Sequence, residues 1–167
     1  PLINNYLQGI TKMAYMNQEK KAIIKAALDQ ALAGSGIKYS LKVDHYSSIT
    51  CTIKSAPIDF IGAFQAADQF QLEKKYLQVN PYWFNEHFTE EASGWLGKII
   101  AALKAANWYD KSDAMIDYFD IAYYIHLNIG AWNKPFEHKP AAPKKLKTII
   151  NDCCLLQNTK KILMCLF

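Results

Sequence analysis

The sequence contains no arginine. All 19 of its basic residues are lysines, set against 15 acidic residues, and the formal net charge is +4. Lysine is a point charge that lacks the planar fork with which arginine contacts guanine edges and phosphates in a bidentate way. The sequence therefore disfavours sequence-specific reading of duplex nucleic acid.

Cysteine is scarce, and long apolar runs are missing. The chain has four cysteines, with no CxxC pair and no histidine at zinc-finger spacing, so we expect reduced thiols and neither a metal nor another cofactor. No stretch approaches the roughly 20 apolar residues of a membrane span, and the first 12 residues carry no hydrophobic signal region. These features predict a cytoplasmic protein without a membrane span.

The positive charge is unevenly distributed along the chain. Residues 1–138 hold 13 lysines and 14 acidic residues, whereas residues 139–167 hold six lysines and one aspartate. Pro135, Pro140 and Pro143 mark the change in composition. We therefore expect a peripheral segment over residues 1–15, a single domain over residues 16–138, and a Pro/Lys-rich linker with an amphipathic tail over residues 139–167.

The periodicity of apolar residues predicts an α+β fold. Helical spacing favours helices over residues 17–33 and from Thr89 onward, with Thr89 as the cap of the second. Alternation predicts a hairpin over residues 37–54, a short third strand over residues 76–79 and a strand over residues 121–129. Residues 58–75 are best interpreted as a loop with a short helix, and residues 82–88 as a short aromatic helix. We expect a small antiparallel sheet of three to four strands with two main helices packed on one face, followed by a C-terminal tail with a short helix.

Polar residues with catalytic or metal-binding chemistry are present but do not form a recognisable motif. Asp110, Asp113, Asp117 and Asp120 lack the alternating ligands and central glycine of a calcium loop, which favours cap and turn roles. His126 is interpreted as a hydrogen-bonded strand histidine, because no serine or cysteine can be paired with it. Cys51 alternates with Ile49 and Ile53, which predicts an inert, buried thiol. We therefore predict no catalytic residues and no metal site.

Aromatic residues are more abundant than one small core obviously needs. They fill the core, form a protein interface or stack on unpaired bases, and the sequence leaves all three roles open. In the strand over residues 121–129, the face that carries Tyr124 and His126 is expected to be exposed. The candidate binding residues are Tyr82, Trp83, Tyr124, His126 and Trp132.

The tail supplies a second kind of candidate site. Lys144, Lys145 and Lys147 form a candidate cluster for binding phosphates or an anionic membrane, although a lysine cluster in a tail is commonly just solvated. Even four phosphate contacts would give weak binding that depends strongly on salt.

Four segments of the chain resemble a known group of proteins. They are AYMNQEKKAIIKAAL from Ala14, KYSLKVDHYSSITCTIKSAPIDF, VNPYWFNEHF, and DKSDAMIDYFDIAYYIHLNIGAWNKPF from Asp110. Together they resemble small uncharacterised proteins of tailed phages and prophages, over about residues 14–136. The first helix and hairpin are also similar to a large polyvalent protein-associated domain of mobile elements. The resemblance implies a phage or plasmid origin and a role in the cytoplasm of an infected bacterium, and it supplies no catalytic residues.

Together, the resemblance and the aromatic surplus favour a non-enzymatic protein that binds a host factor, in host takeover or defence evasion. A host protein is favoured over nucleic acid as the partner. The alternative is a nucleic-acid-binding accessory protein of a phage or plasmid. The oligomeric state is left open.

Overall fold

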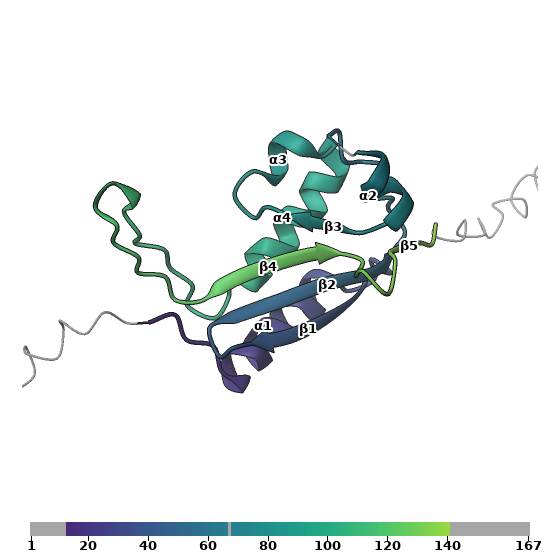
Figure 1. Cartoon of the computed structure of the whole chain (residues 1–167). Helices are drawn as coiled ribbons and strands as arrows, with labels where there is room; N and C mark the ends of the chain where they lie inside the picture. Colours follow the sequence, from purple (N-terminus) through teal and green to yellow (C-terminus); the bar gives the residue numbers. More distant parts are fainter. Residues whose placement is uncertain (1–12, 67, 141–167) are drawn as a thin grey trace, which may run out of the picture.

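The computed structural model describes residues 13–66 and 68–140. Its main elements are two long helices and a mixed sheet, shown in Figure 1. The helices are α1 (Gln18–Ala31), α2 (Gln69–Lys74), α3 (Phe84–His87) and α4 (Glu90–Leu103), and a short 3-10 helix spans Ala114–Ile116. The strands are β1 (Lys38–Asp44), β2 (Ser48–Ala56), β3 (Leu77–Val79), β4 (Tyr124–Ile129) and β5 (Glu137–His138).

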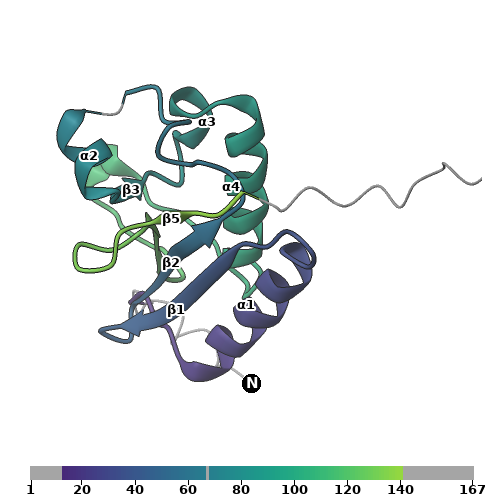
Figure 2. The same cartoon turned by 90° about the vertical axis from the view of Figure 1, so that its right-hand side faces the viewer.

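The α+β class is confirmed, and the two long helices cover one face of the sheet as expected (Figure 2). The strand order is β1-β2-β4-β3, with β5 beside the end of β2. The sheet is mixed, however, because β2 and β4 are parallel while β1 and β3 are antiparallel to their neighbours. The chain between β2 and β4 contains β3 and α4, and this long crossover allows the central pair to run parallel.

Local sequence accounts for the two long helices. Asn17 caps α1, since its side-chain oxygen accepts a hydrogen bond of 2.8 Å from the backbone N–H of Lys20. Thr89 precedes α4 but makes no side-chain cap bond, so the prediction that it caps the helix is wrong in that detail. Helix α4 is held instead by its buried face, which includes Leu96, Ile99 and Leu103.

The sheet has one buried face and one open face. Ile49, Cys51 and Ile53 of β2 point toward the helices and pack with Leu127 and Ile129 of β4. Directly paired residues share a face, so Thr50 and His126 lie together on the side without helices. The aromatic residues therefore belong partly to the core and partly to the surface. Tyr123 and Phe60 are fully buried, whereas other aromatic residues are exposed.

Strand β4 begins later than the sequence predicted. The predicted strand starts at residue 121, but Ala122 donates its N–H to the carbonyl of Tyr109 and accepts from the N–H of Tyr15. These backbone groups have partners outside the sheet, which explains why the strand starts at Tyr124. Strand β5 was not predicted, and the predicted tail helix lies outside the described residues. Among the helices of the described residues, none is long and apolar enough to cross a membrane.

Candidate binding groove

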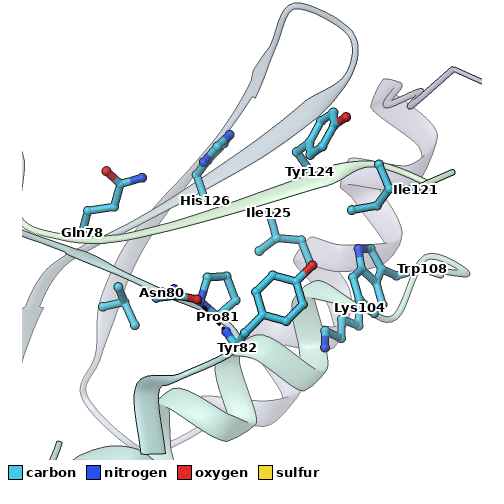
Figure 3. Close-up of a pocket in the computed structure, with 11 residues that line it drawn as sticks. Gln78, Asn80, Pro81, Tyr82, Lys104, Trp108, Ile121, Tyr124, Ile125 and His126 are labelled. Atoms are coloured by element: carbon cyan, nitrogen blue, oxygen red, sulfur yellow. Dashed lines mark hydrogen bonds between the residues drawn. The ribbon is translucent and has the colours of Figure 1, made fainter. Parts of the chain in front are cut away.

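A groove opens where β3 and β4 separate. The last paired residues are Val79 and Leu127, after which the chain turns away from the sheet at Asn80 and Pro81. On the β3 side, residues 124–126 of β4 therefore have no strand partner. The resulting space, called here the aromatic groove, has a volume of about 450 Å³ (Figure 3). It is lined by Gln78, Val79, Asn80, Pro81, Tyr82, Lys104, Trp108, Ile121, Tyr124, Ile125 and His126.

One wall of the aromatic groove is built from two aromatic side chains that are fixed by hydrogen bonds. The hydroxyl of Tyr82 donates to the carboxylate of Asp110 at 3.0 Å, and the indole N–H of Trp108 donates to the carbonyl of Tyr123 at 3.1 Å. Burial, and then the bond to Asp110, raise the pKa of Tyr82, so it stays protonated and continues to donate. The aromatic rings are thereby held in place before any ligand arrives.

Lys104 supplies the cation of this wall. Its ammonium nitrogen lies 4.1 Å from the centroid of the Trp108 ring, which is cation–π geometry. Lys104 also helps to lower the pKa of Asp110, although the hydrogen bond from Ser112 is the larger cause. The groove thus combines an apolar interior with one positive charge at its side.

The opposite wall comes from β4. Ile125 points toward Tyr82, while Tyr124 and His126 stand on the other side of the strand, as Figure 3 shows. Tyr124 is 45% exposed. The side chain of His126 is exposed, and its imidazole makes no hydrogen bond within the described part of the chain, so the prediction of a hydrogen-bonded imidazole is wrong. The imidazole is free to contact a partner at the rim.

The structure brings together three of the five predicted binding residues, namely Tyr82, Tyr124 and His126. Trp83 precedes α3 and is exposed outside the aromatic groove. Trp132 lies elsewhere as well, against Phe70, with ring centroids 5.8 Å apart. The predicted anion-binding cluster of Lys144, Lys145 and Lys147 lies outside the described residues.

Sequence reasoning missed Lys104 and Trp108. Both residues come after the apolar stretch of α4 in the sequence, where a lysine or a tryptophan does not by itself indicate a binding site. Trp108 lies beyond the end of the helix. Their separation of four residues was the available signal, because such pairs contact each other along a helix.

Beside the aromatic groove, the chain forms a protruding ribbon over residues 110–121, called here the arm (Figure 1). Asp110 pairs with Ile121 and Asp113 with Tyr118 across the ribbon. The side chain of Asp113 accepts from the N–H of Met115, and that of Asp110 from the N–H of Ser112. The predicted turn and cap roles are therefore confirmed for these two aspartates.

Two further chemical features bear on the predictions. Cys51 is buried and free, and burial raises the pKa of its thiol to about 12, which confirms the inert thiol. Within residues 13–66 and 68–140, no group of three or more histidine, cysteine, aspartate or glutamate side chains could hold a metal ion.

The fold and the groove describe an α+β protein with a preformed, largely apolar cleft that carries a few polar groups at its edges. Such a cleft is suited to binding an apolar group and orienting it through its rim. Comparison with protein-family models, curated proteins and solved structures finds no significant match to this chain.

Proposed function

We propose that this is a non-enzymatic interaction protein of a phage or another mobile element, which binds a host protein in the bacterial cytoplasm. The aromatic groove receives an apolar side chain of that partner. The observation that carries the proposal is the position of Tyr82, Trp108 and Tyr124 around one open cleft. Tyrosine and tryptophan are the residues most enriched at the centres of protein interfaces.

The groove offers enough binding energy for a single anchor residue. Burying a leucine or phenylalanine side chain stabilises a complex by about 2 to 3 kcal/mol. Because Tyr82 and Trp108 are already held by hydrogen bonds, little side-chain entropy is lost when the anchor enters. The free edge of β4 at residues 124–126 also offers backbone groups to an extended segment beside the anchor.

Affinity purification with matched variants tests this function. The Tyr82→Ala/Tyr124→Ala double variant removes both exposed rings of the aromatic groove, and Trp132→Ala removes an equally exposed ring elsewhere. We expect a host protein that is captured by the wild type and by Trp132→Ala but lost from the double variant. Capture of the same proteins by all three, or of none by the wild type, would overturn the proposal.

Nucleic-acid binding is the second candidate, and the open face of the sheet favours it. Tyr124 and His126 lie on this face beside β2, whose Lys54 is exposed, and β1 adds Lys42, which is paired with Asp44. A ring for base stacking and lysines for phosphates would support weak binding to single strands.

Fluorescence anisotropy with a single-stranded oligonucleotide tests this alternative. It predicts affinity that falls steeply from low to moderate salt, and a flat response would contradict it. A chain that ends at Pro140 keeps β5 and removes Lys144, Lys145 and Lys147. Equal binding by the full-length and shortened chains would eliminate a role for that cluster.

A further inference from the structure

The tip of the arm exposes large apolar side chains to solvent. Met115 is 92% exposed, Ile116 71% and Phe119 66%. The arm also contains four aspartates and one lysine, a net charge of −3. An apolar tip flanked by acidic residues fits a recess that is apolar inside and basic around its edge.

Such a recess exists on this chain, between α1 and the free edge of β1. It has a volume of about 630 Å³, and Tyr39 and Leu41, which are partly exposed, supply most of its apolar surface. We call it the lysine groove, since it is lined by Lys21, Lys25, Lys38 and Lys54 with Asp29 as the single acid, a net charge of +3. Asp29 is paired with Lys25 at 2.6 Å, and the other three lysines make no salt bridge among the residues that the structure describes.

The base of the arm and the Lys54 end of the lysine groove lie at opposite ends of β2. The arm leads into β4 at Tyr124, which pairs with Ser48 at the start of β2, whereas Lys54 lies near the end of β2. At roughly 3.3 Å per residue, these ends of β2 are about 20 Å apart. The arm projects away from the body and does not lie against α1 or β1 of its own chain, as Figure 1 shows.

We propose that the arm of one copy docks into the lysine groove of a second copy. Met115, Ile116 and Phe119 cover the apolar surface at Tyr39 and Leu41, while Asp113 and Asp117 face the lysines. The ribbon of the arm lies along the free edge of β1. Lysines on an exposed edge strand also disfavour direct pairing of two such edges. The acidic arm carries the opposite charge to these lysines, so it is the strand that can pair with this edge.

Reciprocal docking produces a closed dimer. If the arm of each copy enters the groove of the other, the same contact forms twice and the buried area doubles. A contact made in one direction only would instead extend into chains. Both arrangements require an intact arm and an intact lysine groove, and they differ in the mass of the assembly.

Charge reversal tests the contact directly. Lys21→Glu/Lys54→Glu makes the groove acidic, and Asp113→Lys/Asp117→Lys makes the arm basic. In sedimentation velocity of the full-length chain, we expect each variant alone to associate at least about tenfold more weakly than the wild type. An equimolar mixture of the two is expected to associate again, because each arm then meets a groove of opposite charge.

The apolar part is tested by Met115→Ser/Phe119→Ser, with Phe70→Ser as a control, since all three side chains are exposed. We expect the arm variant to lose association and the control to keep it. Circular dichroism shows that each variant is folded. A wild type that stays monomeric at high micromolar concentration would overturn the proposal. Variants that associate like the wild type, or a mixture that fails to recover, would also overturn it.

Discussion

At the scale of single residues, Tyr123 links the core to the aromatic groove. Its ring is fully buried, its hydroxyl donates to the carbonyl of Leu103 at 2.8 Å, and its own carbonyl accepts from Trp108. The carbonyl of Leu103 lies in the last turn of α4, and no backbone N–H of the turn that follows donates to it. Tyr123 thus supplies a hydrogen-bond donor to the end of α4 and also positions Trp108 in the aromatic groove.

Replacement of Tyr123 by phenylalanine leaves the carbonyl of Leu103 without this donor. We expect the Tyr123→Phe variant to lose about 1 to 2 kcal/mol of unfolding free energy, measured by urea denaturation. Tyr39→Phe is the control, since the hydroxyl of Tyr39 bonds to Asp29 at the surface, where water can replace it. Equal losses in the two variants would contradict the role given to Tyr123.

Alkaline pH should destabilise the protein through two buried acids. Burial raises the pKa of Cys51 from 9.0 to about 12 and that of Tyr123 from 10.0 to about 12. The folded state therefore retains protons that the unfolded state releases, so this contribution is complete below pH 9 and is lost as the pH rises. Urea midpoints at a series of pH values should fall from about pH 9 upward, and less steeply in Tyr123→Phe. A constant midpoint up to pH 11 would contradict the burial of these groups.

The sequence could predict residues whose environment follows from alternation. Cys51 was assigned to the buried face because Ile49 and Ile53 flank it at a spacing of two, and Tyr124 and His126 were assigned to the opposite face of their strand. Trp108 could not be predicted in this way. The four-residue spacing indicates only its contact with Lys104. Its bond to the carbonyl of Tyr123 and the loss of strand pairing beside β4 have no periodic signature.

At the scale of elements, Gly130 is the position where β4 turns toward β5. Its φ angle is +72°, and an added Cβ would lie 2.4 Å from the carbonyl oxygen of Lys75 and 2.8 Å from the backbone nitrogen of Phe136. These backbone atoms also bond to each other, since the N–H of Phe136 donates to the carbonyl of Lys75. A side chain at residue 130 would therefore force the two segments apart.

Gly130→Ala and Gly34→Ala form a matched pair. Both glycines have a positive φ, but an added Cβ at Gly34 meets nothing within 4 Å. We expect Gly34→Ala to cost about 1 kcal/mol from backbone strain alone, and Gly130→Ala to cost about 3 kcal/mol or more because the clash is added. Thermal and urea denaturation measure both. Similar losses for the two variants would show that the close approach at Gly130 is not important.

The helices and the hairpin were predictable because their patterns are local. Helix α1 and strands β1 and β2 occur where apolar periodicity and the turns predicted them, within a few residues at the ends. Strand β5 was not predictable, since it has two residues and depends on the edge of β2 near Ser55. The late start of β4 has the same kind of cause, because Ala122 bonds to Tyr15 and Tyr109 rather than to a strand.

At the scale of the whole molecule, the parallel pairing of β2 with β4 determines where the aromatic groove lies. It places β4 in the centre of the sheet and leaves β3 as a short partner that covers only part of it. Periodicity cannot specify which strands pair or in what direction, so an antiparallel sheet was the expectation. The aromatic groove depends on the parallel pairing of β2 with β4, so its position could not be inferred from the sequence.

The central claim is that the aromatic groove contacts a host protein. Incorporation of the photocrosslinker benzoylphenylalanine at residue 124, compared with residue 132, tests it in bacterial cells, because both positions hold exposed aromatic residues. We predict that residue 124 forms a crosslink to one host protein that residue 132 does not form. Crosslinks from residue 124 only to nucleic acid, or the same products from both positions, would contradict the account.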